Sequence, residues 1–404
     1  MCPDKDFLSP CPNLIAIVGG GRWARVLIEV LSVIVSNDTI ITIHSLHNYQ
    51  AMLAWVLQNK FRQNVTVYAD LPKFDKHTIG AMIVVNAARD HESAIEKGLN
   101  ACVPVLVEKP VTLSYTATLR LAKLARKKQT LFAPAHIFLF TRYLFNFSDL
   151  VNSSGKIKSI QIDWADPKLE KRHGEHKYFD QGLPIFFDCL PHVLSIISVV
   201  TKEKSIKCTN LVLHKGGSDI EIKLMLGDIF CDIRLIRNSN ARKRTINVTA
   251  NQQLQLDFTK EPGVINNGTS IVSGDHKWTT GERPAAQMLS AFLTQSAGGR
   301  PDARLDIGQG LCANELIDEV SHFYNQALFL WLKDKLFSPV LMDDDLQYAL
   351  REILLVDGHL SDDIEPCIKR IQSEFSGKTA DYWYERLNKA SKPYDVIRRI
   401  ASGN

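Results

Sequence analysis

Three residue types in this sequence have the spacing and setting needed for acid–base work on a small carbon substrate. Lys109 follows an apolar run and precedes Pro110, which biases the lysine toward an extended backbone. An ammonium group at that point can hydrogen-bond a reacting oxygen and stabilise a developing alkoxide. Asp188 and His192 are four residues apart, so on a helix they share a face. Histidine is the residue type whose reference pKa lies close to working pH, so His192 suits removal of a hydroxyl proton.

Each of these residues also has a plainer interpretation. Lys109 could be a surface lysine on a loop, and the Asp188–His192 pair could be a buried capping pair. Polar groups inside the apolar run Leu183–Val200 should be hydrogen-bonded or functional, which favours a role for the pair. Pro191 lies between them and indicates a helix that is irregular or only just beginning.

A glycine-rich turn near the N-terminus predicts a dinucleotide site. Leu14–Val18 leads into G-x-G-x-x-A, formed by Gly19, Gly21 and Ala24 around Arg22 and Trp23. The first glycine permits a tight strand-to-helix turn, the second lets pyrophosphate approach the backbone, and the small third residue allows close packing. The first N–H groups of the helix would bind the phosphates. The alternative is a tight turn that binds nothing.

The choice between NAD(H) and NADP(H) depends on the end of the second expected strand, at Ile43–Asn48. No acid occurs there to bind a ribose 2′-hydroxyl. Ser45, His47 and Arg22 could instead accept a 2′-phosphate, which favours NADP(H). The other interpretation is that Ser45 or Asn48 binds a ribose hydroxyl of NAD(H).

The elements that must position these residues alternate along the first 135 residues. Apolar strands that alternate with amphipathic helices predict a parallel sheet covered on both faces, a doubly wound Rossmann fold. The expected strands are Leu14–Val18, Thr39–Ile43, Val65–Tyr68, Ala81–Val85, Val103–Val107 and Leu131–Ala135. The expected helices are Trp23–Val35, Asn48–Lys60, His91–Asn100 and Ser114–Lys128.

The pattern changes after about residue 155 to strands joined by short turns, which predicts an α+β domain with a largely antiparallel open sheet. Its expected strands are Lys156–Trp164, Leu211–His214, Ile220–Leu226, Ile229–Ile236, Thr245–Ala250 and Leu254–Phe258, with a charged loop at Lys168–Lys177. Helices are expected at Leu183–Val200, Ala285–Gln295 and Gly308–Leu332, and appended helices at Asp343–Val356, Asp362–Phe375 and Ala380–Ile400. We therefore predict a Rossmann domain (1–137), a substrate and oligomerisation domain (138–337) and a helical extension (338–404).

Composition narrows the class of protein. The 404 residues are 45% hydrophobic and 23% charged, which suits folded domains rather than disorder. A net charge of +4 gives no basic stripe for nucleic acid, so no nucleic-acid partner is expected. The longest apolar run contains Pro184, Asp188, Pro191 and His192, so no membrane span is expected. Scattered cysteines without metal spacing and the lack of a secretory signal predict no metal site and a cytoplasmic protein.

Taken in order, these motifs resemble the Gfo/Idh/MocA family of glucose–fructose oxidoreductases and inositol dehydrogenases, over about residues 13 to 335. The motifs are the glycine turn, Asn86–His91, Glu108-Lys109-Pro110, and Asp188 with His192. The resemblance implies an NAD(P)-dependent oxidoreductase with a cis peptide before Pro110 that fixes Lys109 toward the nicotinamide. It implies that Asp188 orients His192 or binds a substrate hydroxyl. It further implies cofactor contacts for Trp23, Asn86, His91 and Glu108, a substrate contact for Arg142, and a homodimer or homotetramer.

His91 could equally be a helix-start residue, and Arg142 could form a structural salt bridge. The chain also departs from the family pattern. Leu190 replaces a usual glycine, Ser195 an acid and Ala87 a proline, and the C-terminal helices have no usual counterpart. These changes argue against a plain sugar or inositol dehydrogenase.

The leading hypothesis is hydride transfer between a nicotinamide cofactor and a small polar metabolite, sugar- or polyol-like, at C–OH or C=O. The alternatives are an imine reductase of secondary-metabolite or siderophore biosynthesis, and a non-catalytic NAD(P)-binding sensor or partner protein.

Overall fold

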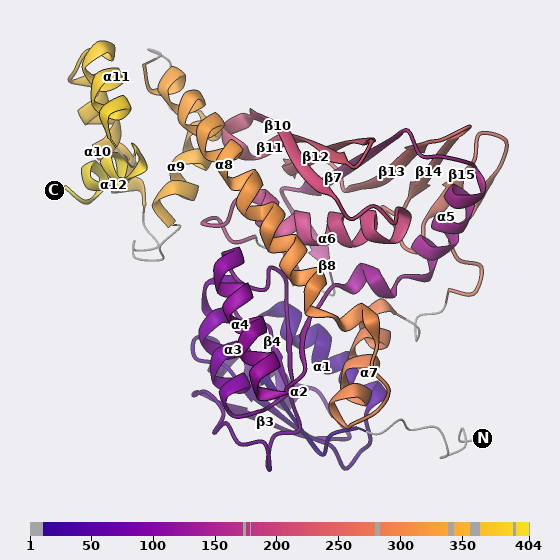
Figure 1. The fold of residues 1–404 in the computed structure, drawn as a ribbon. Helices are drawn as coiled ribbons and strands as arrows, with labels where there is room; N and C mark the ends of the chain where they lie inside the picture. Colours follow the sequence, from indigo (N-terminus) through magenta and orange to yellow (C-terminus); the bar gives the residue numbers. More distant parts are fainter. Residues whose placement is uncertain are drawn as a thin grey trace. The chain divides into compact units, whose positions relative to one another are not determined.

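The computed structural model describes residues 11–172, 175–177, 179–278, 283–337, 343–355, 364–390 and 393–403. The chain forms two compact units (Figure 1). The first comprises Met1–Leu150, Leu190–Lys202 and Ser273–Asp318, and the second comprises Val151–Cys189, Glu203–Val272 and Glu319–Asn404. Both units are therefore assembled from distant segments of the chain. The division into three domains at residues 137 and 337 stays a prediction.

The first unit contains a six-stranded parallel sheet in the order β3-β2-β1-β4-β5-β6. This order, with the switch between β1 and β4, confirms the predicted Rossmann fold. The strands are β1 (Leu14–Val18), β2 (Ile40–His44), β3 (Asn64–Tyr68), β4 (Ala81–Val84), β5 (Val105–Val107) and β6 (Phe132–Pro134).

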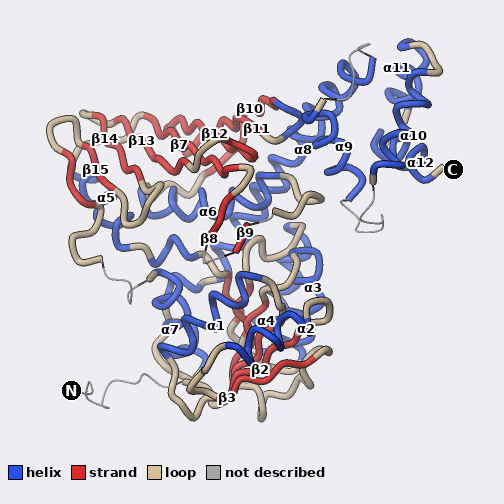
Figure 2. Tube along the Cα trace, turned by 180° about the vertical axis from the view of Figure 1, so that it is seen from behind, coloured by secondary structure: helices blue, strands red, loops and turns tan. Residues whose placement is uncertain are grey.

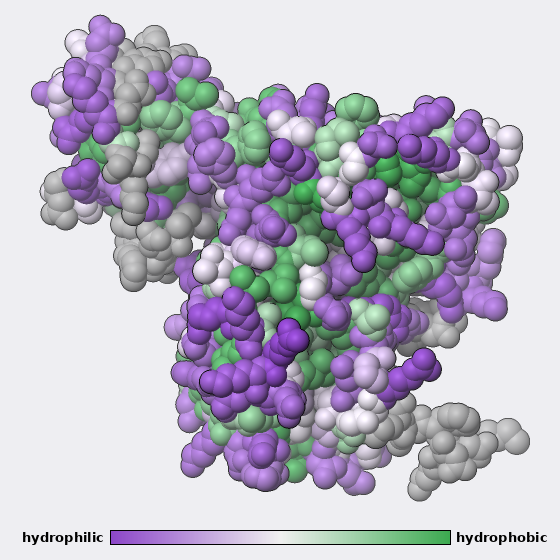
Figure 3. Space-filling model, viewed as in Figure 1, coloured by the Kyte–Doolittle hydropathy of each residue, from purple (hydrophilic) through white to green (hydrophobic). Residues whose placement is uncertain are grey.

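Both faces of this sheet are buried, which explains why its strands are apolar throughout. Ile15 and Ile17 join one core cluster, whereas Ala16 and Val18 join a second one on the opposite face. The helices are α1 (Arg22–Ile34), α2 (Tyr49–Gln58), α3 (His91–Asn100), α4 (Tyr115–Lys128) and α7 (Pro284–Ser296). The outer side of α3 and α4 is mostly hydrophilic (Figure 3).

The second unit contains an eight-stranded sheet in the order β10-β11-β12-β7-β13-β14-β15-β16 (Figure 2). Its strand pairs are antiparallel except for β12 with β7, which confirms the predicted, largely antiparallel sheet. On β11, buried Ile220, Ile222 and Leu224 alternate with more exposed neighbours, so one face lies open. The strands are β7 (Ser159–Pro167), β10 (Ile206–His214), β11 (Asp219–Leu226), β12 (Ile229–Ser239), β13 (Lys243–Thr249), β14 (Gln253–Asp257), β15 (Val264–Asn266) and β16 (Ile271–Ser273).

Three expectations about local structure were wrong. The predicted charged loop Lys168–Lys177 contains a hairpin of β8 (Glu170–Arg172) and β9 (Glu175–Lys177). The predicted helix Ala380–Ile400 is two helices, because Pro393 lacks an N–H and fits only the first turn of the second one. Pro191 does not start a helix, since the surrounding helix begins six residues before it.

The remaining helices are α5 (Arg142–Ser153), which was not predicted, and α6 (Ile185–Val200), α8 (Ile307–Phe337), α9 (Asp344–Leu355), α10 (Glu365–Ser376), α11 (Ala380–Lys389) and α12 (Pro393–Ser402). Positions 356 and 362–363, at the predicted ends of two helices, lie outside the described residues. Among the helices that can be described, none has the length and apolarity required to cross a bilayer.

Candidate active site

The glycine turn is shaped by a close approach of two strands. Gly19 has φ of +133°, which L side chains rarely adopt, and its N–H donates to the His44 carbonyl at 2.9 Å. A β-carbon on Gly19 would lie 2.6 Å from the carbonyl carbon and oxygen of Val85. Gly19 is therefore required by the fold itself, whether or not a ligand binds.

Gly21 is different, because nothing in the fold demands a glycine there. Its backbone is extended, with φ of −82°, and no other atom lies within 4 Å of where its β-carbon would be. It is the N-cap of α1, which has no side-chain cap and no acidic residue in its first turn. The open space and the free end of the helix dipole fit a pyrophosphate group.

The end of β2 offers few exposed groups for the ribose. Ser45 is only 3% exposed, and its hydroxyl accepts a hydrogen bond from the Asn48 N–H at 3.2 Å. His44 is held by the Asp70 carbonyl at 2.8 Å and stacks on Tyr68, and burial lowers its pKa. The exposed polar side chains in this segment are His47 and Asn48.

Two predicted cofactor residues bind each other. The Trp23 indole N–H on α1 donates to Glu108 Oε1 at 2.5 Å, just after β5. The other carboxylate oxygen, Oε2, accepts from the Lys109 N–H at 3.3 Å. This pair links the first turn of α1 to the carboxyl end of β5. The Glu108 carboxylate thus helps to fix the backbone from which the Lys109 side chain projects.

His91 is buried, with 1% of its surface exposed, and connects two loops at this edge of the sheet. Its Nδ1 lies 2.9 Å from the Pro110 carbonyl and its Nε2 lies 3.2 Å from the Asn86 carbonyl. Burial lowers its pKa, so the neutral ring donates to one of these carbonyls at a time. These contacts of His91 hold the loop that contains Lys109 and Pro110, and its predicted cofactor contact stays a prediction.

Asn86 presents an acceptor that the described residues leave unused. Its Oδ1 is buried, and within the described chain no donor bonds to it. A buried carbonyl oxygen without a donor is costly. A ribose hydroxyl or an amide N–H of a bound nicotinamide cofactor would satisfy this oxygen, so Asn86 fits its predicted place in the cofactor site.

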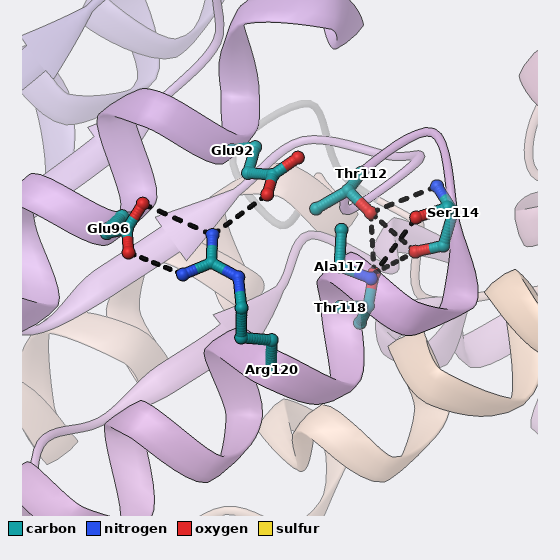
Figure 4. Close-up of polar contacts among 7 residues, drawn as sticks. All are labelled: Glu92, Glu96, Thr112, Ser114, Ala117, Thr118 and Arg120. Carbon is teal, nitrogen blue, oxygen red and sulfur yellow. Dashed lines mark hydrogen bonds and ion pairs between the residues drawn. The ribbon is translucent and has the colours of Figure 1, made fainter.

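The loop that follows Lys109 is rigid. The Lys109–Pro110 peptide is cis, as the resemblance implies. Thr112 bonds Thr118 at 2.8 Å, and the Ser114 hydroxyl accepts the Ala117 N–H at 3.1 Å, which caps α4 (Figure 4). On the outer side of α4, Arg120 joins Glu92 and Glu96 of α3 (Figure 4). These contacts fix both helices that flank the lysine.

The sequence interpretation missed His136. Because Val107 of β5 is in register with Pro134 of β6, Lys109 and His136 both lie two residues beyond the paired strand ends. His136 is 2% exposed, and neither ring nitrogen has a hydrogen-bond partner in the described part of the chain. Burial and the nearby Lys109 charge lower its pKa to about 4. The available signal was a histidine directly after the sixth predicted strand, Leu131–Ala135, just as Lys109 closely follows the fifth.

His192 lies in the same unit as Lys109 and His136. Its ring meets the Phe138 ring edge-on, with centroids 5.1 Å apart and planes at 80°. Phe138 is two residues beyond His136, so the segment that carries His136 also contacts His192. The helix passes through Pro191, and the Ser195 hydroxyl donates to the Pro191 carbonyl at 2.7 Å. Ser195, which occupies the place of a family acid, therefore has its hydroxyl bonded to the backbone of its own helix.

Asp188 precedes His192 by four residues on α6, and the helix passes from the second unit to the first after Cys189. The Asp188 side chain is 29% exposed, and one carboxylate oxygen lies 3.8 Å from a nitrogen of buried Arg237. Asp188 and His192 therefore share a helix and a face, as predicted from their spacing.

Arg142 is engaged in a pair on the first unit. Its Nε donates to Asp275 Oδ2 at 2.7 Å, and its Nη2 donates to the Lys277 carbonyl at 2.7 Å. Asp275 is 4% exposed, whereas the Arg142 side chain is 35% exposed, so the carboxylate of this ion pair is shielded from solvent and the guanidinium is not. The salt bridge that the sequence offered as one interpretation of Arg142 is present, and the substrate contact implied by the resemblance stays a prediction.

The comparisons with known proteins agree with this geometry. Residues 14–136 match a family described as oxidoreductase family, NAD-binding Rossmann fold, under the name GFO_IDH_MocA. Within these residues, which include the glycine turn, Asn86–His91 and Glu108-Lys109-Pro110, this confirms the resemblance drawn from the motifs and the prediction of an NAD(P)-dependent oxidoreductase. No curated protein matches the chain significantly.

Solved structures share the fold at low identity. A UDP-N-acetylglucosamine 3-dehydrogenase from Acidithiobacillus ferrooxidans is 16% identical, with a TM-score of 0.61 over 78% of this chain and 98% of its own. A 3-ketoreductase from Actinomadura kijaniata, in complex with TDP-benzene and NADP, is 17% identical, with a TM-score of 0.61 over 76% and 96%. A myo-inositol dehydrogenase from Lactobacillus casei, with NAD(H) and myo-inositol, is 14% identical, with a TM-score of 0.60 over 78% and 95%.

The two glycines of the turn should respond differently to substitution. We expect Gly19→Ala to destabilise the fold, because its β-carbon has no room beside Val85. Gly21→Asp should leave the melting temperature nearly unchanged, because its side chain has room. It should abolish cofactor binding, seen as loss of the change in nicotinamide fluorescence on titration with NADPH or NADH, because a carboxylate there repels pyrophosphate. Gly21→Ala is the matched control for side-chain size alone. Equal loss of stability in the Gly19 and Gly21 variants would contradict this assignment.

His136 should make the protein sensitive to acid. Its pKa is about 4 in the folded chain against an ordinary 6.5, so between these values only the unfolded chain gains the proton. The free energy of unfolding should fall as the pH drops from 6.5 to 4, by up to about 3 kcal/mol from this group.

We expect the free energy of unfolding of His136→Asn, measured by urea unfolding, to fall less between pH 7 and pH 4.5 than that of the wild type. His47→Asn, at an exposed histidine, is the control and should unfold like the wild type at both values. Identical acid sensitivity in the wild type and His136→Asn would show that His136 is not held neutral.

Proposed function

Because the N-terminal Rossmann domain of this chain belongs to the Gfo/Idh/MocA oxidoreductase family, we propose that the protein transfers hydride between NADP(H) or NAD(H) and an oxygen-bearing carbon of a small sugar- or polyol-like metabolite. The observation that carries this proposal is the register of β5 and β6, which sets Lys109 beside buried His136 at the edge where such sheets bind ligands.

The residues present fit a nicotinamide cofactor. The open space at Gly21 and the N–H groups of α1 would hold the pyrophosphate, and Asn86 Oδ1 would accept a hydrogen bond from the ribose or the carboxamide. When bound, the cofactor supplies or accepts the hydride. We favour NADP(H), because β2 ends without an acid and His47 is exposed beside Ser45.

Lys109 would donate a hydrogen bond to the reacting oxygen and stabilise negative charge as it develops. His136 remains neutral at working pH, so it adds no competing positive charge. Either of its ring nitrogens could accept a hydrogen bond from the Lys109 ammonium and aim it.

His192 would take the hydroxyl proton during oxidation and return it during reduction. Its ring plane is set by Phe138. Asp188, one turn earlier on the same helix, would orient His192 or bind a neighbouring substrate hydroxyl. Three side chains thus have different proposed tasks: Lys109 binds the reacting oxygen, His136 orients Lys109, and His192 exchanges the proton.

We also propose that the chain forms a homodimer or homotetramer through the open face of the second sheet. Phe230 on β12 is 64% exposed on this face, in register with Ser159 of β7. In sedimentation velocity, Phe230→Asp should shift the wild-type oligomer toward monomer. Val33→Asp, at a residue 79% exposed on α1, is the matched control and should not. A monomeric wild type would end this proposal.

Measuring turnover and cofactor binding in the same variants distinguishes residues that act in catalysis from residues that bind the cofactor. Purified protein would be tested with NADP⁺ and NAD⁺ against UDP-N-acetylglucosamine, myo-inositol and other nucleotide-activated sugars and polyols. Lys109→Ala should keep nicotinamide fluorescence titration intact but lower kcat by about 10²-fold or more, since a donor to a developing oxyanion is removed. His192→Asn should lower kcat by about 10²-fold and remove the pH limb due to the base.

Lys97→Ala, on α3, is the matched control variant and should keep the wild-type kcat. The alternative substrates are cyclic imines, tested for reduction by NADPH. Reaction with imines alone would replace the carbonyl proposal by imine reduction. Cofactor binding without turnover of either class would favour a sensor or partner protein.

A further inference from the structure

Arg237 is a buried cation on β12 whose contacts come from three different elements. Its side chain is 3% exposed and lies within 3.8 Å of the Asp188 carboxylate on α6. One terminal nitrogen, Nη1, donates to the Leu183 carbonyl at 2.7 Å and to the Tyr348 hydroxyl on α9 at 3.2 Å. The guanidinium carbon also lies 4.6 Å from the centre of the Phe179 ring. All these residues belong to the second unit.

Tyr348 comes from the helical extension. It packs its ring against Phe179, at 6.3 Å between centroids, while its hydroxyl meets Arg237. The solved relatives match up to 78% of this chain while being covered almost completely themselves, so more than a fifth of this chain lies outside the shared fold. Arg237 therefore connects the predicted helical extension to a predicted active-site acid.

Helix α9 is seated too closely to be a loosely appended element. A β-carbon on Gly182, just before α6, would lie 2.6 Å from the Leu355 carbonyl oxygen at the end of α9. At the other end, a β-carbon on Gly216 would lie 2.1 Å from the Asp345 carbonyl oxygen. Both glycines allow backbone-to-backbone approach. The helix is thus docked at two ends, with Tyr348 between them.

The next turn of α9 carries a second buried charge. Glu352 is 2% exposed, and its Oε1 accepts the Tyr324 hydroxyl of α8 at 2.6 Å. Burial raises its pKa to about 7, and the Tyr324 hydrogen bond and the Arg237 charge oppose that rise. Cys189, next to Asp188 in the chain, feels the charges of Asp188, Asp166 of β7, Arg237 and Arg244 of β13. Asp166 and Arg244 form an ion pair with each other.

We propose that Arg237 is a positioning residue for Asp188, and that helix α9 holds Arg237 in place through the Tyr348 hydroxyl. This inference rests on the proposed function of Asp188. A buried guanidinium needs its charge balanced and its N–H groups bonded. With Leu183 and Tyr348 holding Nη1, the Nη2 side remains directed at the Asp188 carboxylate.

The consequence is that the helical extension influences Asp188 without contacting it, through Tyr348 and Arg237. The positive charge of Arg237, 3.8 Å away, attracts the Asp188 carboxylate and holds it in position one turn before His192 on α6. Without the Tyr348 hydroxyl, the guanidinium loses one of the bonds that orient it. Asp188 would then be held less firmly, although α6 itself would be unchanged.

The direct test is the titration of Asp188, which needs no substrate. Protein with ¹³C-labelled aspartate carboxyls is titrated by NMR, and the Asp188 signal is the one lost in Asp188→Asn. We expect Arg237→Gln to raise the Asp188 pKa by about one unit, because a nearby cation is removed. Tyr348→Phe, which keeps the ring, should raise it by a smaller amount.

Tyr394→Phe is the matched control. This tyrosine lies on neighbouring α12 and donates to the Asn325 carbonyl at 2.6 Å, away from Arg237. It should leave the Asp188 titration unchanged. Circular dichroism and NADPH fluorescence titration check that each variant is folded, and if Arg237→Gln does not fold, Tyr348→Phe decides the question.

The link to catalysis is tested by combining variants on a substrate found by the turnover screen. Arg237→Gln should lower kcat about tenfold in the wild-type background and cause no further loss in Asp188→Asn, because it acts through that carboxylate. Additive losses would overturn the positioning role.

Three results of the titration would also count against the proposal. An unmoved Asp188 pKa in both variants would overturn it, and a shift in Arg237→Gln alone would overturn the part assigned to α9. A shift in Tyr394→Phe as large as in Tyr348→Phe would show general loosening instead. Because the titration needs no turnover, its failure is distinguishable from a failure of the proposed function.

Discussion

The parallel pairing of β5 with β6 is the constraint on which the candidate site depends. Val107 and Pro134 are register partners, so the chain segments that leave the two strands carry Lys109 and His136 forward together. Parallel strands end at one edge of a sheet, and this edge is where open α/β sheets bind ligands. The Glu108–Trp23 bond and the His91–Pro110 contact then fix the lysine loop from both sides. A shift of either strand by one residue would separate these groups.

The electrostatics of this edge follow from burial. Neutral histidines are the stable form where water is excluded, and an ammonium beside His136 strengthens that preference. His136 and His91 differ in what they do with their nitrogens. His91 uses both on backbone carbonyls, whereas the described chain leaves both nitrogens of His136 without a partner. A buried ring nitrogen without a hydrogen-bond partner costs free energy of folding in a purely structural residue. The same arrangement is expected in a residue whose partner is a bound ligand.

Helix α6 shows how an addition to a common fold can reach its chemistry. The helix carries Asp188 and His192 on one face, and Arg237 approaches Asp188 from β12. The contacts of Tyr348 with Arg237 and of Leu355 with Gly182 bring α9 to the same region of the second unit. Close backbone approach at two glycines accompanies this docking, and α9 also buries apolar side chains such as Leu350 and Ile353. The extension is therefore built into the unit that holds Asp188.

The sequence by itself determined the Rossmann fold, the largely antiparallel second sheet and the oxidoreductase family, because those depend on strand periodicity and short motifs that are local in the chain. It also indicated Gly19, Lys109 and the Asp188–His192 spacing. It missed the hairpin of β8 and β9, because strands of three charged residues carry weak periodicity. It also missed α5 and merged α11 with α12 across Pro393, although these helices are amphipathic. Only the tertiary structure decided that Arg142 pairs with Asp275, that His136 stands beside Lys109, and that Arg237 joins Asp188 to Tyr348. These pairs are far apart in the chain, and only strand register and helix docking bring them within reach of one another.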